Sequence, residues 1–285
     1  MVDNEHIINA YNSKMSNEDF KRLSNYIFNE LGIKMPIEKK IMLEGRLQKR
    51  LVELKHNNYN TYIDYVFSPE GSATELMNMI DVVTTNKTDF FRESAHFDFL
   101  YKEAVPEFVK TFGARQLKVW SAGCSSGEEP YTLTFVLSEA IQNQNLSDFA
   151  ISATDISTRM LQKAYNGIYP EDRVAVVPLS LKKKYLLRSK DRASKNIRIV
   201  PELRKKISFS RLNFMDDYYS INENFDIIFC RNVLIYFERE VQEKVIQKLC
   251  SKLKLGGYFF LGHSESISNM KVPLQQIKPT IFKKV

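Results

Sequence analysis

Hydrophobic positions in the first third of the chain recur every three or four residues, which is the spacing of one face of an α-helix. They predict a helix that begins after an N-cap at Ser16, with Asp19 three positions on, and ends at Gly32. A second helix is predicted over residues 38–54. Residues 68–71, Ser-Pro-Glu-Gly, are typical of a turn, and the pattern predicts about four helices before Thr84.

The pattern changes after Gly113, where short apolar runs alternate with amphipathic stretches. This alternation is typical of a parallel sheet covered by helices, so we expect an α/β fold. The predicted strands are residues 117–121, 149–154, 225–230 and 257–261. A helix is predicted over 238–253, with Gly256-Gly257 as its stop. Two further runs, 197–200 and 207–210, are predicted to form short strands of a small inserted sheet.

The net charge of +7 is concentrated in one segment. Residues 182–211 hold 12 Lys and Arg against Asp191 and Glu202, a net of +10, whereas residues 1–92 are close to neutral. Such a segment attracts an acidic partner or a phosphate backbone, or it is a solvated loop. The charge alone does not choose between these interpretations.

Composition narrows the class of protein. An apolar content of 44% supports a buried core, and no run approaches the roughly 20 apolar residues that cross a bilayer. The polar opening, residues 1–6, lacks the order of a signal peptide, so we expect a cytosolic protein. Cys124, Cys230 and Cys250 form no Cys-x-x-Cys pair, which indicates reduced thiols in or near a core.

A turn of small residues follows the first predicted strand and opens a helix: residues 122–131 read Ala-Gly-Cys-Ser-Ser-Gly-Glu-Glu-Pro-Tyr. Small residues there let a ligand approach the backbone closely. Glu128 and Glu129 would repel a phosphate, so a cationic or neutral nucleoside fits better. Asp155 ends the second strand, where α/β nucleoside sites place a carboxylate on the ribose hydroxyls. We expect Glu128 itself to be a solvated first-turn carboxylate.

Five strings in this chain follow a known order. They are Thr-Asn-Lys-Thr-Asp-Phe-Phe-Arg at 85–92, Trp-Ser-Ala-Gly-Cys-Ser-Ser-Gly-Glu-Glu-Pro-Tyr at 120–131, Ala-Thr-Asp-Ile at 153–156, Phe-Cys-Arg-Asn-Val-Leu-Ile-Tyr-Phe at 229–237 and Gly-His-Ser-Glu at 262–265. With them the chain resembles the chemotaxis receptor methyltransferase family, called the CheR family, over nearly its whole length. The resemblance implies a protein-glutamate O-methyltransferase that uses S-adenosylmethionine (SAM), releases S-adenosylhomocysteine (SAH) and tunes the adaptation of chemotaxis receptors.

The resemblance also implies a domain order. An all-α N-terminal domain that docks on the receptor is expected over residues 1–83, and a linker over 84–98 contributes to the cofactor pocket. A Rossmann-like α/β SAM-binding domain follows over 99–285, with a small antiparallel β-subdomain inserted at about 180–212. The order of predicted helices and strands agrees with this division.

The family positions imply the residues of the site. The expected cofactor contacts are Asn86, Thr88, Arg92, Glu129, Asp155, Asn213, Phe214, Arg231 and Asn232. Phe214 departs from the more usual aliphatic residue, and we expect it to reshape the adenine pocket without abolishing binding. Tyr236 is expected beside the transferred methyl group and Arg92 on the incoming carboxylate. No metal is expected.

Without the resemblance, several of these residues fit ordinary roles. Asn86 and Thr88 fit helix caps, and Arg92 fits a surface ion pair. Asn232 and Tyr236 fit a turn residue and a core aromatic side chain.

Two features of the sequence bear on how the receptor substrate is bound: a basic stripe and one loop. Arg46, Lys49 and Arg50 lie three or four residues apart and form a basic stripe, which we expect to dock on the acidic receptor surface; a solvated helix face is the alternative. Residues 188–198 are long enough to resemble family members that bind a receptor C-terminal peptide as an added strand. The segment lacks their usual glycines, so this tether stays open. We expect a cytoplasmic monomer, recruited to receptor arrays.

Two other classes of protein compete with this interpretation. A nucleic-acid methyltransferase fits the pI of about 9.1, but residues 231–236, Arg-Asn-Val-Leu-Ile-Tyr, are not the Asn/Asp-Pro-Pro-Tyr/Phe string common in such enzymes. A non-catalytic adaptor has no need of a complete cofactor pocket. We therefore expect an enzyme. We expect it neither to bind nucleic acid nor to insert into a membrane.

Overall fold

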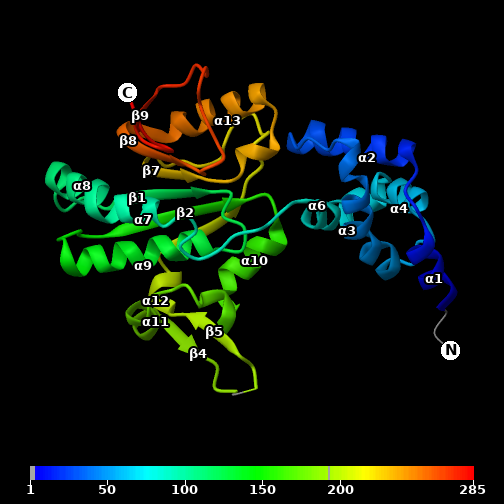
Figure 1. The fold of residues 1–285 in the computed structure, drawn as a ribbon, viewed down its shortest axis with the longest axis horizontal. Helices are drawn as coiled ribbons and strands as arrows, with labels where there is room; N and C mark the ends of the chain where they lie inside the picture. Colours follow the sequence, from blue (N-terminus) through cyan, green and yellow to red (C-terminus); the bar gives the residue numbers. More distant parts are fainter. Residues whose placement is uncertain (1–3, 192) are drawn as a thin grey trace. The chain divides into compact units, whose positions relative to one another are not determined.

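The computed structural model describes residues 4–191 and 193–285 and divides into two compact units. The first unit runs to Thr85 and includes Tyr236–Glu238, and the second comprises Asn86–Ile235 and Arg239–Val285 (Figure 1). Among the described residues no helix is long and apolar enough to cross a membrane.

The first unit is helical, as predicted. Its elements are α1 (Asn4–Asn12), α2 (Asn17–Leu31), the 3-10 helix η1 (Ile37–Lys39), α3 (Lys40–Glu53), α4 (Tyr59–Val66), α5 (Pro69–Thr74) and α6 (Leu76–Val83). The Ser16 hydroxyl accepts the Asp19 N–H at 2.9 Å, and Gly32 ends α2 with φ of 68°, which confirms both predicted ends of α2. The described residues therefore hold six α-helices before Thr84 rather than about four.

The predicted turn at residues 68–71 was wrong for a physical reason. The Ser68 hydroxyl accepts the Gly71 N–H at 3.1 Å and Pro69 takes the first helical position, so this string starts α5. The same residue types favour turns and helix starts, and only the following chain distinguishes them.

The second unit is an α/β domain. Its helices are α7 (Ala95–Phe99), the π-helix η2 (Leu100–Ala104), α8 (Val105–Phe112), α9 (Glu128–Asn143), α10 (Thr158–Asn166), η3 (Glu171–Val174), α11 (Leu179–Tyr185), α12 (Pro201–Arg204) and α13 (Arg239–Lys252), with η4 (Leu234–Tyr236) at the boundary between the units. Its strands are β1 (Leu117–Ala122), β2 (Phe149–Asp155), β3 (Ile168–Pro170), β4 (Leu186–Arg188), β5 (Asn196–Ile199), β6 (Ile207–Arg211), β7 (Phe225–Cys230), β8 (Leu253–Leu261), β9 (Leu274–Lys278) and β10 (Ile281–Lys284).

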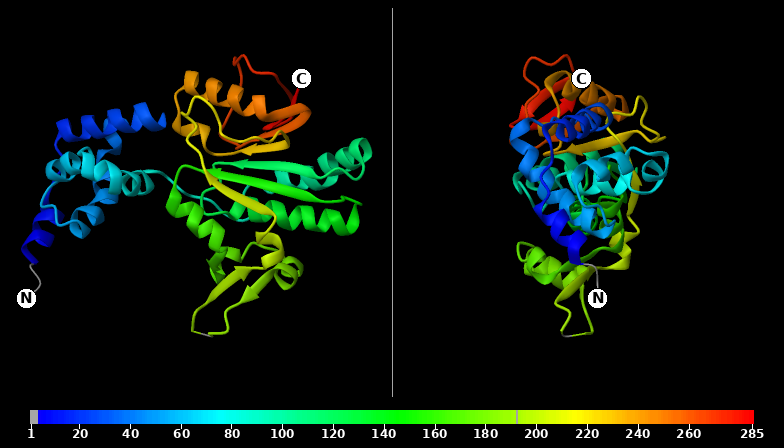
Figure 2. Two further views of the ribbon diagram at one scale, coloured as in Figure 1. Left: turned by 180° about the vertical axis from the view of Figure 1, so that it is seen from behind. Right: turned by 90° about the vertical axis from the view of Figure 1, so that its right-hand side faces the viewer.

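The main sheet has the order β6-β2-β1-β7-β8-β10-β9. Strands β6, β2, β1, β7 and β8 pair in parallel, and β10 is antiparallel to its neighbours β8 and β9. Every residue of β7 is buried, as expected for a central parallel strand. Helices α9 and α10 lie close to β2, and α13 lies close to β8 (Figure 2). The four predicted strands and the predicted α/β class are confirmed.

The small sheet has the order β3-β5-β4, with antiparallel pairs (Figure 1). The prediction that residues 207–210 belong to it was wrong, because β6 pairs in parallel with β2 at the edge of the main sheet, with Ile207 beside Ile151.

Gly256 and Gly257, which were predicted to stop the helix before them, lie inside β8 instead. A Cβ on Gly257 would lie 2.8 Å from the Asp226 carbonyl oxygen, so close strand packing accounts for that glycine.

Candidate active site

The carboxyl ends of the parallel strands meet at one edge of the main sheet, which is where open α/β sheets bind ligands. The segments that follow β1, β2, β6 and β7 contain most of the predicted cofactor residues. The fold therefore brings together residues that are far apart in the chain, such as Arg231 and Arg92, 139 positions from each other.

Asp155 is central to this edge. Its Oδ2 accepts the Ser125 N–H at 2.7 Å and its Oδ1 accepts the Ser157 N–H at 2.9 Å, while the side chain is buried. Two backbone donors therefore hold the carboxylate between the turn after β1 and the start of α10. A fixed acid at the end of β2 is suited to accept hydroxyl hydrogens from a ribose.

Two glycines shape the turn beside Asp155. Gly123 has φ of 84° and Gly127 has φ of 96°, values that side chains rarely adopt. A Cβ on Gly123 would also lie 2.4 Å from Val233 Cγ2, and one on Gly127 would lie 2.8 Å from Ala164 Cβ. These glycines are required by backbone conformation and by packing. The two glycines thus let the turn pack closely against the segment after β7 and against α10, beside Asp155.

Glu129 and Arg231 form a buried ion pair at the same edge. Arg231 Nε donates to Glu129 Oε2 at 2.9 Å, and the Ser121 hydroxyl donates to Glu129 Oε1 at 2.7 Å. Arg231 Nη2 donates to the Arg92 carbonyl oxygen at 2.6 Å. The Arg231 side chain is only 2% exposed, so any cofactor contact of this residue uses its main chain.

The third partner of Arg231 is His96, which the sequence analysis missed. Arg231 Nη1 lies 2.9 Å from His96 Nδ1, and His96 Nε2 lies 2.7 Å from the Thr280 hydroxyl. A guanidinium can only donate, so His96 is neutral, accepts at Nδ1 and carries its proton on Nε2. Burial, and next the charge of Arg231, lower the pKa of His96 to about 4.

Glu93, His96 and His263 place one ligand atom each within 4.8 Å of one another. Arg231 Nη1 lies 3.9 Å from Glu93 Oε2 and 2.9 Å from His96 Nδ1. The Arg231 guanidinium therefore supplies a positive charge next to the Glu93 carboxylate. Burial alone would raise the pKa of Glu93, but the Arg231 charge and hydrogen bonds from His263 and Asn232 lower it. The cluster is therefore explained by ion pairing within the protein.

The linker before α7 is fixed to the turn after β1. The Ser125 hydroxyl donates to the Asn86 carbonyl oxygen at 3.0 Å, and Arg173 bonds both the Thr88 carbonyl oxygen and Asp89. Thr88 is buried, whereas Arg92 is half-buried. Among the described residues the Arg92 guanidinium has one hydrogen bond, to the Lys87 carbonyl oxygen at 3.1 Å, so further N–H groups of Arg92 are available to a ligand.

The expectation that Glu128 is solvated was wrong. Its carboxylate is 2% exposed, accepts Arg173 Nη2 at 2.9 Å and accepts the Ser126 hydroxyl at 2.7 Å. A buried acid needs such a partner because an unpaired buried charge is costly. Arg173 lies 45 positions away in the chain, so local pattern gave no sign of this pair.

Asn213 and Phe214 follow β6 in a short loop that Lys248 of α13 holds in place. Asn213 Oδ1 accepts the Met215 N–H at 3.0 Å, and Phe214 is buried. Lys248 of α13 donates to the carbonyl oxygens of Phe214 and Asp216, both at 2.7 Å. Burial lowers the pKa of Lys248, a cost that these bonds offset.

The remaining predicted residues lie in the first unit. Tyr236 groups with that unit, so its expected place beside the methyl group stays a prediction. Arg46 donates to the Val83 carbonyl oxygen and to the Thr85 hydroxyl, and Arg50 is paired with Glu75 and Glu53. Lys49, with its side chain 83% exposed, is the member of the stripe that is presented to solvent.

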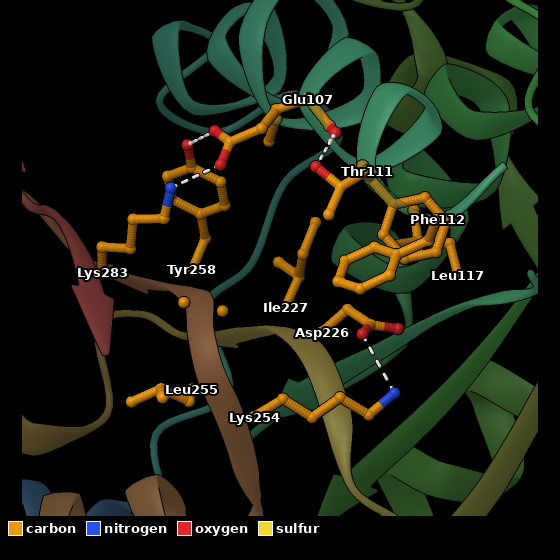
Figure 3. Close-up of a pocket in the computed structure, with 14 residues that line it drawn as sticks. Glu107, Thr111, Phe112, Leu117, Asp226, Ile227, Lys254, Leu255, Tyr258 and Lys283 are labelled. Atoms are coloured by element: carbon orange, nitrogen blue, oxygen red, sulfur yellow. Dashed lines mark hydrogen bonds and ion pairs between the residues drawn. The ribbon is translucent and has the colours of Figure 1, made fainter. Parts of the chain in front are cut away.

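Another pocket, of about 230 Å³, lies at the opposite end of the strands (Figure 3). It is lined by Leu117 and Asp226, near the starts of β1 and β7, and by Leu255 and Tyr258. Its charged groups pair within the protein: Asp226 with Lys254, and Glu107 with Lys283 and Tyr258. This pocket contains none of the predicted site residues.

An α/β sheet with an acid at the end of β2 and a glycine turn after β1 fits a nucleoside-binding enzyme, and comparison with known families gives the class, a SAM-dependent methyltransferase. Residues 86–283 match the family described as "CheR methyltransferase, SAM binding domain" and residues 18–84 match "CheR methyltransferase, all-alpha domain". The chain belongs to the CheR methyltransferase family.

Relatives extend over almost the whole chain. A chemotaxis protein methyltransferase of Borreliella burgdorferi is 38% identical over 277 residues, which cover 96% of both chains. Chemotaxis protein methyltransferase 2 of Pseudomonas aeruginosa is 32% identical and covers 93% of this chain and 92% of its own. The Salmonella typhimurium chemotaxis protein methyltransferase is 33% identical, with 90% of this chain and 86% of its own covered. The resemblance predicted from the five strings is confirmed.

Proposed function

We propose that this enzyme transfers the methyl group of SAM to glutamate side chains of chemotaxis receptors and forms glutamyl methyl esters. The observation that carries the proposal is the pair of acids at the sheet edge, Asp155 at the end of β2 and Glu129 on α9. They lie in a chain whose relatives over nearly its whole length are named chemotaxis protein methyltransferases. Placement in the cytoplasm at receptor arrays follows from this substrate. A monomeric state is also part of the proposal.

The chemistry asks little of the protein. SAM supplies a methyl group on a positively charged sulfur. A glutamate side chain, with an ordinary pKa of about 4.3, is already ionised at neutral pH, so no general base is needed. The residues of this chain have to bind the two reactants in line and remove water from the carboxylate.

Five of the predicted residues have a specific role in this proposal. Asp155 accepts the ribose hydroxyls, and Glu129 contributes an acceptor whose position Arg231 fixes. Arg92 holds the incoming carboxylate with its available N–H groups, and Tyr236 lies beside the methyl group. If Tyr236→Phe and Arg92→Ala both kept wild-type turnover and SAH affinity, the roles of these two residues would be wrong.

Receptor docking is proposed for the exposed side of α3, with Lys49 in place of the three-residue stripe. A peptide tether is a weaker part of the proposal. Strands β3 and β4 are the edges of the small sheet, so either offers backbone groups for strand addition. Arg192, in the loop after β4, lies outside the described residues. Calorimetry with a receptor C-terminal peptide tests the tether, and no heat at high concentration would exclude it.

The basic segment gives limited support to a nucleic-acid substrate, because part of its charge is paired. Lys184 bonds Glu139, Arg188 bonds Glu171 and Lys206 bonds Asp148. The test is a competition: the enzyme receives tritiated SAM, receptor-containing membranes and RNA or DNA together. Label on the receptor band supports the proposal, and label on nucleic acid alone contradicts it.

A further inference from the structure

Glu265 is a buried acid beyond the end of β8 whose contacts are unusual. Its Oε1 accepts the N–H groups of Val233 and Leu234, at 2.9 and 2.7 Å. Its Oε2 accepts those of Asn232 and Gly262, at 3.0 and 2.6 Å. One carboxylate thus satisfies four backbone donors and joins the segments after β7 and β8.

The turn that Glu265 holds is strained and tightly packed. Asn232 has φ of 58°, a left-handed conformation that non-glycine residues rarely adopt. Its Nδ2 donates to Glu93 Oε1 at 3.2 Å. A Cβ on Gly262 would lie 2.8 Å from the Asn232 backbone nitrogen, so the two segments touch along their backbones. A strained conformation persists only where surrounding contacts fix it.

We propose that Glu265 is a positioning residue for methyl transfer, which fixes the backbone of residues 232–234 and so orients Asn232 and the approach of the chain to Tyr236. This inference rests on the proposed roles of Asn232 and Tyr236. The N–H groups of Leu234 and Gly262 are buried, so they need a partner inside the protein, and Glu265 supplies one to both segments at once. Burial raises the pKa of Glu265 above its usual value, and the four backbone N–H groups limit that rise.

Glu265→Gln tests the hydrogen bonds of the carboxylate without changing the size of the side chain. Each carboxylate oxygen accepts two N–H groups, so in either orientation the amide nitrogen would face two donors. The control is Asp226→Asn. Asp226 is equally buried, accepts the Lys118 N–H at 2.9 Å and lies near the start of β7, at the other end of that strand from the turn at residue 232.

Both full-length variants are compared with the wild-type enzyme for Tm, SAH affinity by calorimetry, and kcat and KM for methyl transfer. We expect Glu265→Gln to weaken SAH binding and to lower kcat, each by about tenfold or more, because two hydrogen bonds to a charged acceptor are lost. Asp226→Asn lowers Tm but keeps SAH affinity and kcat within about twofold. Wild-type levels of both quantities in a folded Glu265→Gln enzyme would overturn the inference, as would equal losses in the two variants.

If Glu265→Gln does not fold, Glu265→Asp replaces it, since it keeps the charge and withdraws the acceptor by one methylene. Unchanged kcat and SAH affinity in that variant would also overturn the inference. The SAH measurement needs no receptor. A wild-type enzyme that binds SAH but leaves receptors unlabelled would therefore remove the proposed substrate, and the test of Glu265 would stand.

Discussion

Arg231 Nε lies 2.9 Å from Glu129 Oε2 and so ties the residue after β7 to the first turn of α9. Both side chains are almost fully buried, at 2% and 12% exposure. Because Arg231 also bonds His96 and the Arg92 carbonyl oxygen, one guanidinium fixes three segments of the site. We interpret Arg231 as a residue that positions the cofactor pocket.

Arg231→Lys is therefore expected to weaken SAH binding by about tenfold or more. A lysine ammonium cannot reach three acceptors held in the plane of a guanidinium, so Glu129 is left poorly paired. Calorimetry measures the affinity and a thermal melt reports the fold. Arg188→Lys, at a side chain 84% exposed, is the matched control and should leave the affinity unchanged. Equal affinity in the Arg231 variant would show that the ion pair is irrelevant to the pocket.

Asp155→Asn tests the proposed ribose contact. The variant keeps one carbonyl oxygen but loses the charge. A hydrogen bond to a charged acceptor is worth about 1.5–3 kcal/mol against about 0.5–1.5 kcal/mol for a neutral one, so SAH affinity should fall by about 5- to 10-fold for each ribose contact. Asp148→Asn serves as the control, because Asp148 precedes the same strand at its other end and bonds Lys206 and Gln116. An affinity loss that is the same in both variants would argue against a specific contact.

His96 predicts a pH dependence of stability. Its pKa is about 4 in the folded protein against 6.5 for the free side chain, so the unfolded chain binds the proton first as pH falls. The contribution is complete above pH 6.5, is lost as pH falls toward 4, and amounts to about 3 kcal/mol. His96→Asn keeps an acceptor near the Nδ1 position. The difference in unfolding free energy between wild type and this variant should shrink from pH 7 to pH 4, and a constant difference would contradict the assignment.

The docking proposal predicts a contrast on α3. Lys49→Glu should lower receptor methylation severalfold and leave SAH affinity and Tm unchanged, because Lys49 is exposed. Lys21→Glu, on the exposed side of α2, is the control. Arg50→Ala is unsuitable for this purpose, since it leaves Glu75 buried and unpaired and should destabilise the unit by about 3 kcal/mol. Full receptor methylation by Lys49→Glu would refute docking through Lys49.

Periodic and contiguous signals could be predicted from the sequence. The ends of α2, the four central strands and the position of Asp155 follow from local patterns, and the three buried thiols were expected. Long-range pairs could not be predicted. Neither Arg173 beside Glu128 nor Glu265 beside Asn232 has a local pattern, because each pair forms only when distant segments of the chain meet in the fold.

The same limit explains the wrong assignment of β6 and the unequal exposure of the three residues of the basic stripe. The strand β6 was assigned to the small sheet because its neighbours in sequence lie there, whereas its register with β2 depends on the folded sheet. The stripe of Arg46, Lys49 and Arg50 has helical spacing, but Arg50 is used by Glu75, which is 25 positions away. Spacing predicts which side chains share a face, and the fold decides which of them reach solvent.

The measurement that tests the central claim most directly is the chemical stability of the transferred methyl group. Receptor-containing membranes are labelled by the enzyme with tritiated SAM and then treated with mild alkali. A glutamyl methyl ester hydrolyses and releases volatile labelled methanol, which is the result we predict. Label that survives alkali would indicate methylation on nitrogen or carbon and would contradict the proposed esterification of glutamate.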